Sequence, residues 1–166
     1  RKVMEQKKNV PGIEGVVADL IKVDQRYETA IETALGGSIQ NIVTENEDTA
    51  KELIEYLKKN RFGRATFLPL TSVGGRGGFA KPEALKEKGA IGLASTLIRA
   101  DKKYDRVVQH LLGRVLVAEH IDDAIRIARK YKHSIFIVTL EGESLSPGGS
   151  MTGGSTSRSA ALPSAV

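Results

Sequence analysis

The sequence predicts an α+β protein built from two copies of a β-α-β-α-β unit. Two stretches of the chain carry matching residues 77 positions apart, and each stretch contains a helix-type periodicity between short apolar runs. A glycine-rich segment separates the two stretches. The 166 residues are 40% hydrophobic and 27% charged, which suits one globular domain or two small, closely packed lobes.

The repeat is recognised by aligning Gly15 with Gly92. The matched pairs that follow are Leu20 with Leu97, Ile21 with Ile98, Asp24 with Asp101, Tyr27 with Tyr104 and Leu35 with Leu112. Beyond the glycines after each helix, Gly36 and Gly113, the second copy is three residues shorter. The repeat predicts two similar lobes, related by a pseudo-twofold axis.

The first copy begins with a predicted buried strand over Gly15–Ile21. A helix follows, because its apolar residues recur at helical spacing from Tyr27 to Leu35. Gly36 stands just past the helix end, where a left-handed cap favours glycine. The run Ile39–Val43 predicts a second strand.

A second helix is predicted to start at a capping box, Thr44-x-x-Glu47. Its expected buried stripe consists of Ala50, Leu53, Ile54 and Leu57, and the lysines at 58 and 59 complement the helix dipole at its end. The β-rich run 65–70 predicts the third strand of the copy.

The second copy repeats this order of elements. Its predicted strands are 92–98, 115–118 and 135–140, and its predicted helices are 104–112 and a second helix with Ala124, Ile127, Ala128 and Tyr131 inward. Gly113 takes the position of Gly36. The connection, 71–89, contains two glycine pairs and Pro82, which predict a flexible segment with a short helix at 82–88.

The sequence lacks several common catalytic and metal-binding motifs. The chain has no cysteine, which excludes disulfides and thiol chemistry. Its histidines, at 110, 120 and 133, have no metal-ligand spacing, and no Walker A motif occurs. Ser150 lacks the second glycine of a nucleophile elbow. We therefore expect a non-enzymatic protein without a metal.

The most patterned segment is 147–154, Pro-Gly-Gly-Ser-Met-Thr-Gly-Gly. One interpretation is a disordered tail. The other is backbone that passes very close to a second surface, since glycine permits positive φ and removes the side chain. Composition does not decide between the two.

This segment resembles the glycine signature of the hinge domain of bacterial SMC proteins (structural maintenance of chromosomes). The resemblance extends over 12–17, 27–36, 63–70 and 137–142, and so covers the chain from about Gly12 to Ser155. It implies an SMC hinge-like fold with mixed sheets. Residues 1–11 would end an incoming coiled coil, lobe one would span about 12–72, the connection about 73–90 and lobe two about 91–155.

The resemblance also implies a function. Hinges of this family form homodimers, so Gly148, Gly149, Gly153 and Gly154 are expected at the dimer interface. The chain would be the middle of a longer cytoplasmic, nucleoid-associated protein that acts in chromosome condensation and segregation. ATP, magnesium and the accessory subunits are expected at the distant head domains, with no cofactor in this part. The tail 156–166 departs from the family pattern, because it holds one basic residue and Pro163, and it is expected to be non-native or disordered.

A net charge of +5 and a pI near 9.5 permit attraction to DNA, single-stranded or flexible. The candidate phosphate contacts are Lys58, Lys59, Arg61 and Arg64. These residues have a second interpretation as helix-capping and solubilising charges. Two other functions stay open: a stand-alone monomeric nucleic-acid-binding domain, and a small enzyme that holds a phosphorylated ligand on its glycines.

Overall fold

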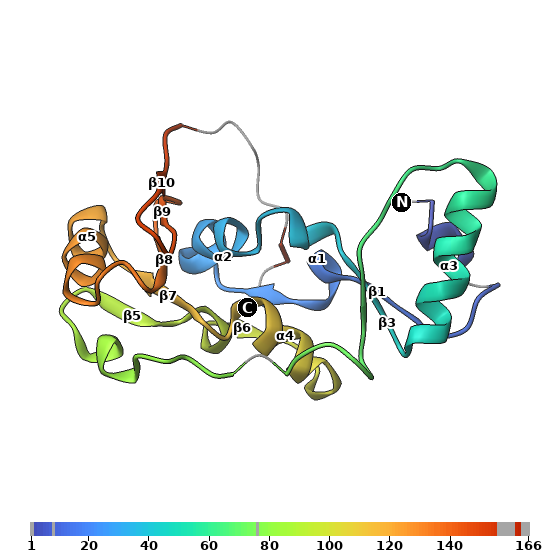
Figure 1. Cartoon of the computed structure of the whole chain (residues 1–166), viewed down its shortest axis with the longest axis horizontal. Helices are drawn as coiled ribbons and strands as arrows, with labels where there is room; N and C mark the ends of the chain where they lie inside the picture. The colour runs from blue at the N-terminus through green and yellow to red at the C-terminus, as the bar shows by residue number, and fades with distance from the viewer. Residues whose placement is uncertain (1, 8, 76, 156–161, 164–166) are drawn as a thin grey trace.

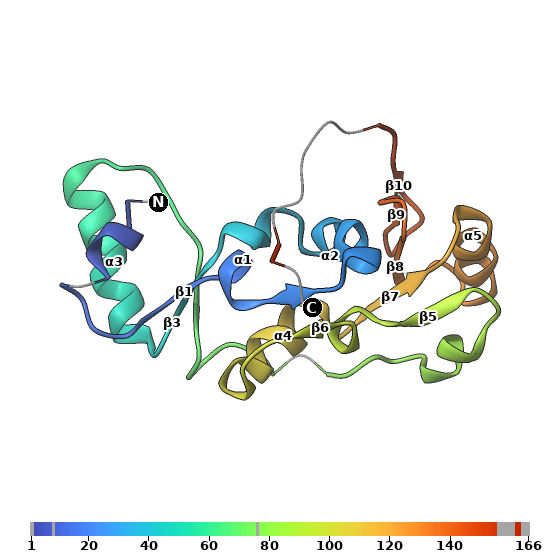
Figure 2. The same ribbon diagram turned by 180° about the vertical axis from the view of Figure 1, so that it is seen from behind.

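The computed structural model describes residues 2–7, 9–75, 77–155 and 162–163. Lobe one contains β1 (Ile13–Val16), α1 (Val17–Leu20), β2 (Lys22–Val23), α2 (Glu28–Leu35), β3 (Ile42–Thr44), α3 (Glu47–Asn60) and β4 (Phe67–Pro69). Lobe two contains β5 (Ala90–Leu93), β6 (Ile98–Arg99), α4 (Asp105–Leu112), β7 (Val115–Ala118), α5 (Ile121–Lys130), β8 (Phe136–Thr139), β9 (Ser144–Leu145) and β10 (Met151–Thr152). The lobes lie side by side along the long axis (Figures 1 and 2).

Each lobe has a mixed sheet, as expected for the α+β class. In lobe one the order is β1-β3-β4, with β1 antiparallel and β4 parallel to β3. In lobe two β5, β7 and β8 repeat that order and those directions, and β9 and β10 extend the sheet beyond β8. Even the register shifts recur, between Ile13 and Gly15 and between Ala90 and Gly92. This topology is compatible with the predicted duplication.

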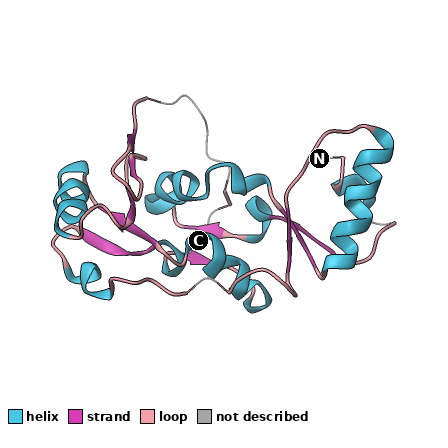
Figure 3. Cartoon of the chain, in the orientation of Figure 1, coloured by secondary structure: helices cyan, strands magenta, loops and turns pink. Residues whose placement is uncertain are grey.

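A two-stranded ribbon joins the lobes at the centre of the molecule. Strands β2 and β6 pair antiparallel, and Lys22 lies opposite Arg99, its repeat-related residue. Equivalent strands that pair antiparallel at equivalent residues are what a local twofold axis produces. Helices and strands occur on both sides of this ribbon (Figure 3).

The largest hydrophobic core is shared by the two lobes. It unites Ile21, Ile31 and Leu35 of lobe one with Leu112 and Val117 of lobe two, all 4% exposed or less. Smaller cores lie under α3 in lobe one and under α5 in lobe two. Since the shared core is assembled from both lobes, neither lobe buries its apolar surface alone, and the two form one cooperative unit.

The predicted first strand is the clearest error in the secondary structure. Residues 15–21 form the end of β1 and then the short helix α1, because the chain bends so that Leu20 folds back over Gly15. A Cβ on Gly15 would lie 3.2 Å from Leu20 Cδ2. In lobe two a 3-10 turn, Ala94–Thr96, interrupts the corresponding segment.

The helix ends also differ from the predictions. Asn46 caps α3, accepting a hydrogen bond at Oδ1 from the Thr49 amide (2.9 Å), and the Thr44 hydroxyl donates to the Asn46 carbonyl instead of forming a capping box. Gly36 has a positive φ of 53°, but its ψ of −133° lies outside the left-handed helical region that was predicted. The backbone of Gly113 is in the right-handed helical region. A side chain is excluded at this position because a Cβ would lie 2.5 Å from the Gln109 carbonyl oxygen.

The two ends of the described chain pack against the body. Val3 and Val10 belong to the small core of lobe one, and only a 3-10 turn, Met4–Gln6, occurs in that segment. Of the predicted tail, Leu162 is buried in the shared core and the Pro163 carbonyl accepts from the Val23 amide at 2.9 Å. Its other residues, 156–161 and 164–166, lie outside the described residues. Within the described ranges, no helix has the length and apolar character to cross a bilayer.

Candidate dimerisation surface

The predicted glycine segment forms the outermost strand of the lobe-two sheet. Met151 and Thr152 of β10 pair with Leu145 and Ser144 of β9. The hairpin is closed by hydrogen bonds from the Ser146 amide to the Ser150 carbonyl and from the Gly149 amide to the Ser146 carbonyl, both 2.9 Å. The other edge of β10 has no strand partner among the described residues. Met151 is 54% exposed, so this edge presents a large apolar side chain to solvent.

The four predicted interface glycines bracket β10, two on each side. Gly148, Gly149 and Gly154 have φ values of 97°, 105° and 132°, a region that side-chain-bearing residues avoid. At Gly153 a Cβ would lie 3.0 Å from Glu143 Cγ. Around Gly148 and Gly154 no atom lies within 4 Å of such a Cβ. Within one subunit, therefore, glycine is required mainly by backbone conformation, and these two positions leave open space beside β10.

A second open edge lies on lobe one, at β4. Strand β8 of lobe two is followed by β9 at its outer edge, whereas β4, its repeat-related strand, has no such neighbour among the described residues. Beside β4 and α3 lies a groove of about 570 Å³, lined by Ile54, Thr66 and Phe67. Lobe one thus lacks the strand that completes lobe two.

Ile54 is the apolar side chain that an added strand beside β4 would cover. It was predicted in the buried stripe of α3, but it is 44% exposed, while Ala50, Leu53 and Leu57 are buried as predicted. Its counterpart in α5 is Ala128, which is 2% exposed and packs in one cluster with Leu145 of β9. The helix periodicity correctly placed Ile54 on the inward face. It is uncovered because no strand occupies the position of β9.

The predicted DNA-contacting residues cluster at the end of α3. Lys58 and Lys59 lie in its last turn, Arg61 is the left-handed C-cap (φ 54°), and Arg64 follows in an exposed loop. Within the described chain none of these four side chains forms an ion pair or hydrogen bond.

Sequence reasoning missed an aromatic residue in the same place. Phe62 is 41% exposed and contacts the Tyr56 ring edge-on, with centroids 5.7 Å apart. The Lys2 ammonium lies 5.1 Å from the Phe62 ring centroid. The sequence signal was a lone phenylalanine within a basic run, Lys58 to Arg64. We call these side chains, with Lys2, the basic patch.

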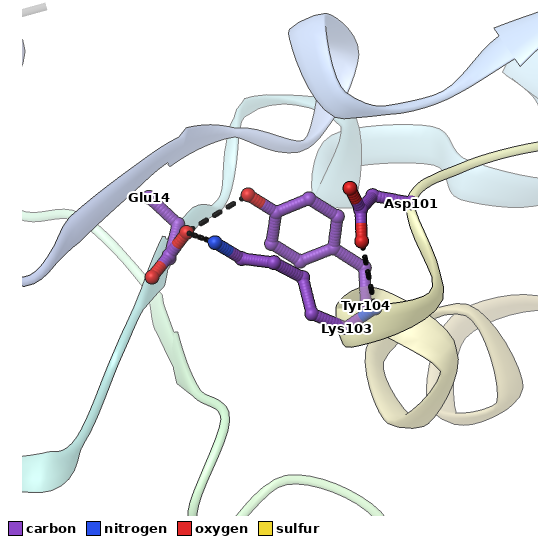
Figure 4. Close-up of polar contacts among 4 residues, drawn as sticks. All are labelled: Glu14, Asp101, Lys103 and Tyr104. Atoms are coloured by element: carbon purple, nitrogen blue, oxygen red, sulfur yellow. Dashed lines mark hydrogen bonds and ion pairs between the residues drawn. The ribbon is translucent and has the colours of Figure 1, made fainter.

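A cluster of polar contacts joins the two lobes (Figure 4). Glu14 Oε1 of β1 accepts from the Tyr104 hydroxyl and from Lys103 Nζ, each at 2.9 Å, and the Asp101 carboxylate accepts from the Lys103 amide. Partial burial alone would raise the pKa of Glu14, but the hydrogen bonds from Lys103 and Tyr104 outweigh it and hold that pKa below its usual value. Burial and the bond to Glu14 raise the pKa of Tyr104.

Among the described residues, no group of three or more His, Asp or Glu side chains could hold a metal ion. Two sheet edges, at β4 and β10, have no strand partner among these residues, and an exposed apolar side chain lies beside each. Open edges of this kind are typical of a protein-association module.

Comparison with known proteins assigns this module. The family model of the SMC proteins flexible hinge domain matches residues 10–128, and the chain therefore belongs to the SMC hinge domain family. It is 48% identical to a chromosome partition protein Smc of Desulfitobacterium hafniense and 44% identical to that of Bacillus subtilis, with 94% and 95% of this chain covered. It spans only 13% and 14% of the length of those relatives.

Solved structures agree with this assignment. An asymmetric dimer of the Geobacillus stearothermophilus SMC hinge domain matches with a TM-score of 0.88 and 42% identity, over 95% of this chain and 65% of that one. The Pyrococcus furiosus SMC hinge domain matches with a TM-score of 0.77 and 35% identity, over 93% and 79%. The predicted family and the α+β hinge fold are thereby confirmed.

Proposed function

We propose that this chain is the homodimerisation hinge of a chromosome partition protein, and that β10 of one copy adds to β4 of the other. One observation carries the proposal: Ile54 is exposed in lobe one where its counterpart Ala128 is covered by β9 in lobe two. Added to β4, a partner's β10 would bury Ile54 and its own Met151 together. The asymmetric dimer named for the Geobacillus stearothermophilus hinge supports self-association.

Strand addition explains both unpaired edges at once. An exposed edge offers a row of backbone donors and acceptors that a second strand can satisfy. Because each copy carries one β10 and one β4, a twofold dimer makes the contact twice and leaves neither edge open. The open space at Gly148 and Gly154 lets the partner's backbone approach.

The test is the mass of the chain in solution. Multi-angle light scattering at micromolar concentration is expected to give a dimer. Replacement of Gly148 and Gly154 by valine is expected to give a folded monomer, checked by circular dichroism, with Gly63→Val as a matched control at an exposed, positive-φ glycine away from β10. A monomeric wild-type chain would refute the proposal.

The role in a longer protein follows from the relatives. The chain spans about a seventh of the length of a chromosome partition protein Smc. We propose that it joins two copies of such a protein and that coiled coils lead away from Gly12 and Ser155. The catalytic work of that protein would then lie outside this chain.

The basic patch supports a second function, contact with single-stranded DNA. The Lys2 ammonium lies near the exposed Phe62 ring, and Arg61 and Arg64 are close to Phe62 in the sequence. A base can stack on such a ring while phosphates bind the cations. Duplex DNA offers no unstacked base, so it would use the cations alone. The patch fits a single strand better than a duplex.

Fluorescence titrations with a labelled oligonucleotide at several salt concentrations would test this function. Phe62→Ala is expected to weaken single-strand binding roughly fivefold or more, since stacking contributes about 1–3 kcal/mol per base, and to leave duplex binding unchanged. Equal losses for both forms of DNA would remove the stacking role. Absence of binding to either would remove the function.

A further inference from the structure

A cavity of the described chain lies beside the β9–β10 hairpin, where Ser146 and Pro147 line it, and none of its lining residues belongs to β4 or to the basic patch. It has a volume of about 700 Å³, within the ~300–1,000 Å³ typical of small-ligand sites. Its walls come from the connection (Phe79 and Lys81), the junction of α4 with β7 (Arg114) and the start of β8 (Phe136). Ser38 adds a contribution from lobe one.

The charge of this cavity is positive. Lys81 and Arg114 line it, and no aspartate or glutamate does. Among the residues that the structure describes, neither cation forms an ion pair or a side-chain hydrogen bond. Two unpaired cations in one concave, half-enclosed space attract an anion, and the arginine fork matches the oxygens of a phosphate group.

The remaining lining residues favour a flat, partly polar ligand. Phe79 and Phe136 are both half-buried and present aromatic surface to the cavity. Three serines, Ser38, Ser134 and Ser146, add hydroxyl groups. The Ser134 hydroxyl donates to the Tyr131 carbonyl at 2.6 Å, so its oxygen remains as an acceptor for a hydroxyl group of a ligand.

We propose that this cavity binds a nucleoside phosphate, with the phosphate on Arg114 and Lys81 and the base against Phe79 and Phe136. The phosphate of such a ligand matches the two cations, and its sugar hydroxyls match the serines. Its flat base matches the aromatic rings. An inorganic anion would leave the aromatic surface empty, and a neutral aromatic molecule would leave the cations unpaired. The proposal does not require dimerisation, because the phosphate and base contacts lie outside β4 and β10, although Ser146 belongs to the hairpin that leads into β10.

Isothermal titration calorimetry on the purified chain tests the site with three probes: adenosine monophosphate, adenosine and inorganic pyrophosphate. The nucleotide is expected to bind at least about tenfold more tightly than either of the others, since each lacks one set of contacts. Amide shifts in NMR spectra should concentrate at Leu111, Val115 and Ser146. Nucleotide binding no tighter than pyrophosphate binding, or shifts confined to other regions, would overturn the proposal.

Variants identify the phosphate contacts. Arg114→Gln and Lys81→Gln are each expected to weaken nucleotide binding about tenfold, the usual order for a hydrogen bond to a charged group. Lys86→Gln is the matched control, because Lys86 is exposed on the same connection and does not line the cavity. Lys81 lies on an exposed segment, so that variant tests the site even if Arg114→Gln fails to fold. Unchanged affinity in both variants would refute the site.

A decanucleotide of deoxyadenosine distinguishes the source of the ligand. If Arg114→Gln weakens its binding, the site takes a nucleotide within a DNA strand as well as a free one. If only the basic-patch variant Phe62→Ala weakens it, the cavity takes free nucleotides alone. Both results are compatible with nucleotide binding at the cavity. The site does not require dimerisation, so a chain that is monomeric in light scattering should still bind the nucleotide.

Discussion

The exposed isoleucine of α3 gives the sharpest quantitative prediction. Full burial of an isoleucine side chain contributes roughly 1.5–3 kcal/mol. Since 44% of Ile54 is exposed in the single chain, covering it would contribute about 1 kcal/mol per copy. Alanine keeps part of that surface, so Ile54→Ala should cost the two contacts of a dimer together about 1.5 kcal/mol, roughly a tenfold rise in Kd.

The stability of the single subunit should fall by about 1 kcal/mol or less. Truncation removes packing from the part of Ile54 that the chain already covers, and the higher helix propensity of alanine offsets some of this loss. The lobe-two counterpart, Ala128, shows that an alanine fits this helix position. Sedimentation velocity across a dilution series measures Kd, and thermal unfolding followed by circular dichroism measures the stability.

Phe62→Ala is the control, because that side chain is similarly exposed at 41% and lies outside the groove. Its dimer Kd should equal that of the wild type. An unchanged Kd for Ile54→Ala, or an equal loss in both variants, would refute the assignment of the groove to the partner strand.

Other predictions test the remaining contacts. Gly148→Ala should lower Tm, because φ of 97° costs a side-chain-bearing residue about 1 kcal/mol or more, while no atom clashes with the added methyl group. Glu14→Gln should lower the free energy of unfolding by about 1 kcal/mol near pH 7, because the bonds from Lys103 and Tyr104 lose a charged acceptor. Since the folded-state pKa of Glu14 is lowered, its contribution is present above the unfolded-state pKa and is lost as pH falls through the folded value. Chemical denaturation from pH 7 to pH 3 should therefore show the two proteins converging in acid, and a constant difference would contradict this. Lys58→Gln should reduce the salt slope of single-strand binding by about 0.7, and an unchanged slope would place the phosphate elsewhere.

The duplication carried most of what the sequence could predict about the fold. Residue types matched at a fixed spacing predicted two lobes, with which the sheet order is compatible, and helical periodicity located α2 and α4 to within a residue or so. What the pattern could not contain was the bend at Gly15. A short apolar run is compatible with a strand or a buried helical turn, and the contact of Leu20 with Gly15 that decides it is tertiary.

The candidate site was also predictable only in part, because local patterns were visible in the sequence and tertiary contacts were not. The glycine pairs were visible, and their arrangement around an edge strand agrees with the interpretation of a surface, although the partner's contact with them stays a prediction. Periodicity alone placed Ile54 on the inward face of its helix, and only the sheet order shows that no strand among the described residues lies beyond β4 to cover its exposed part. Phe62 was passed over because an isolated aromatic residue has no periodic signal.

Cysteine cross-linking tests the contact between β10 and β4 most directly, because the chain has no cysteine of its own. Two single-cysteine variants, Met151→Cys and Thr66→Cys, would be purified, mixed and oxidised. The strand-addition account predicts a disulfide-linked dimer in the mixture and none in either variant alone. A disulfide-linked dimer in the Met151→Cys variant alone would show β10 pairing with β10, and this result, or the absence of a link in the mixture, would contradict the account.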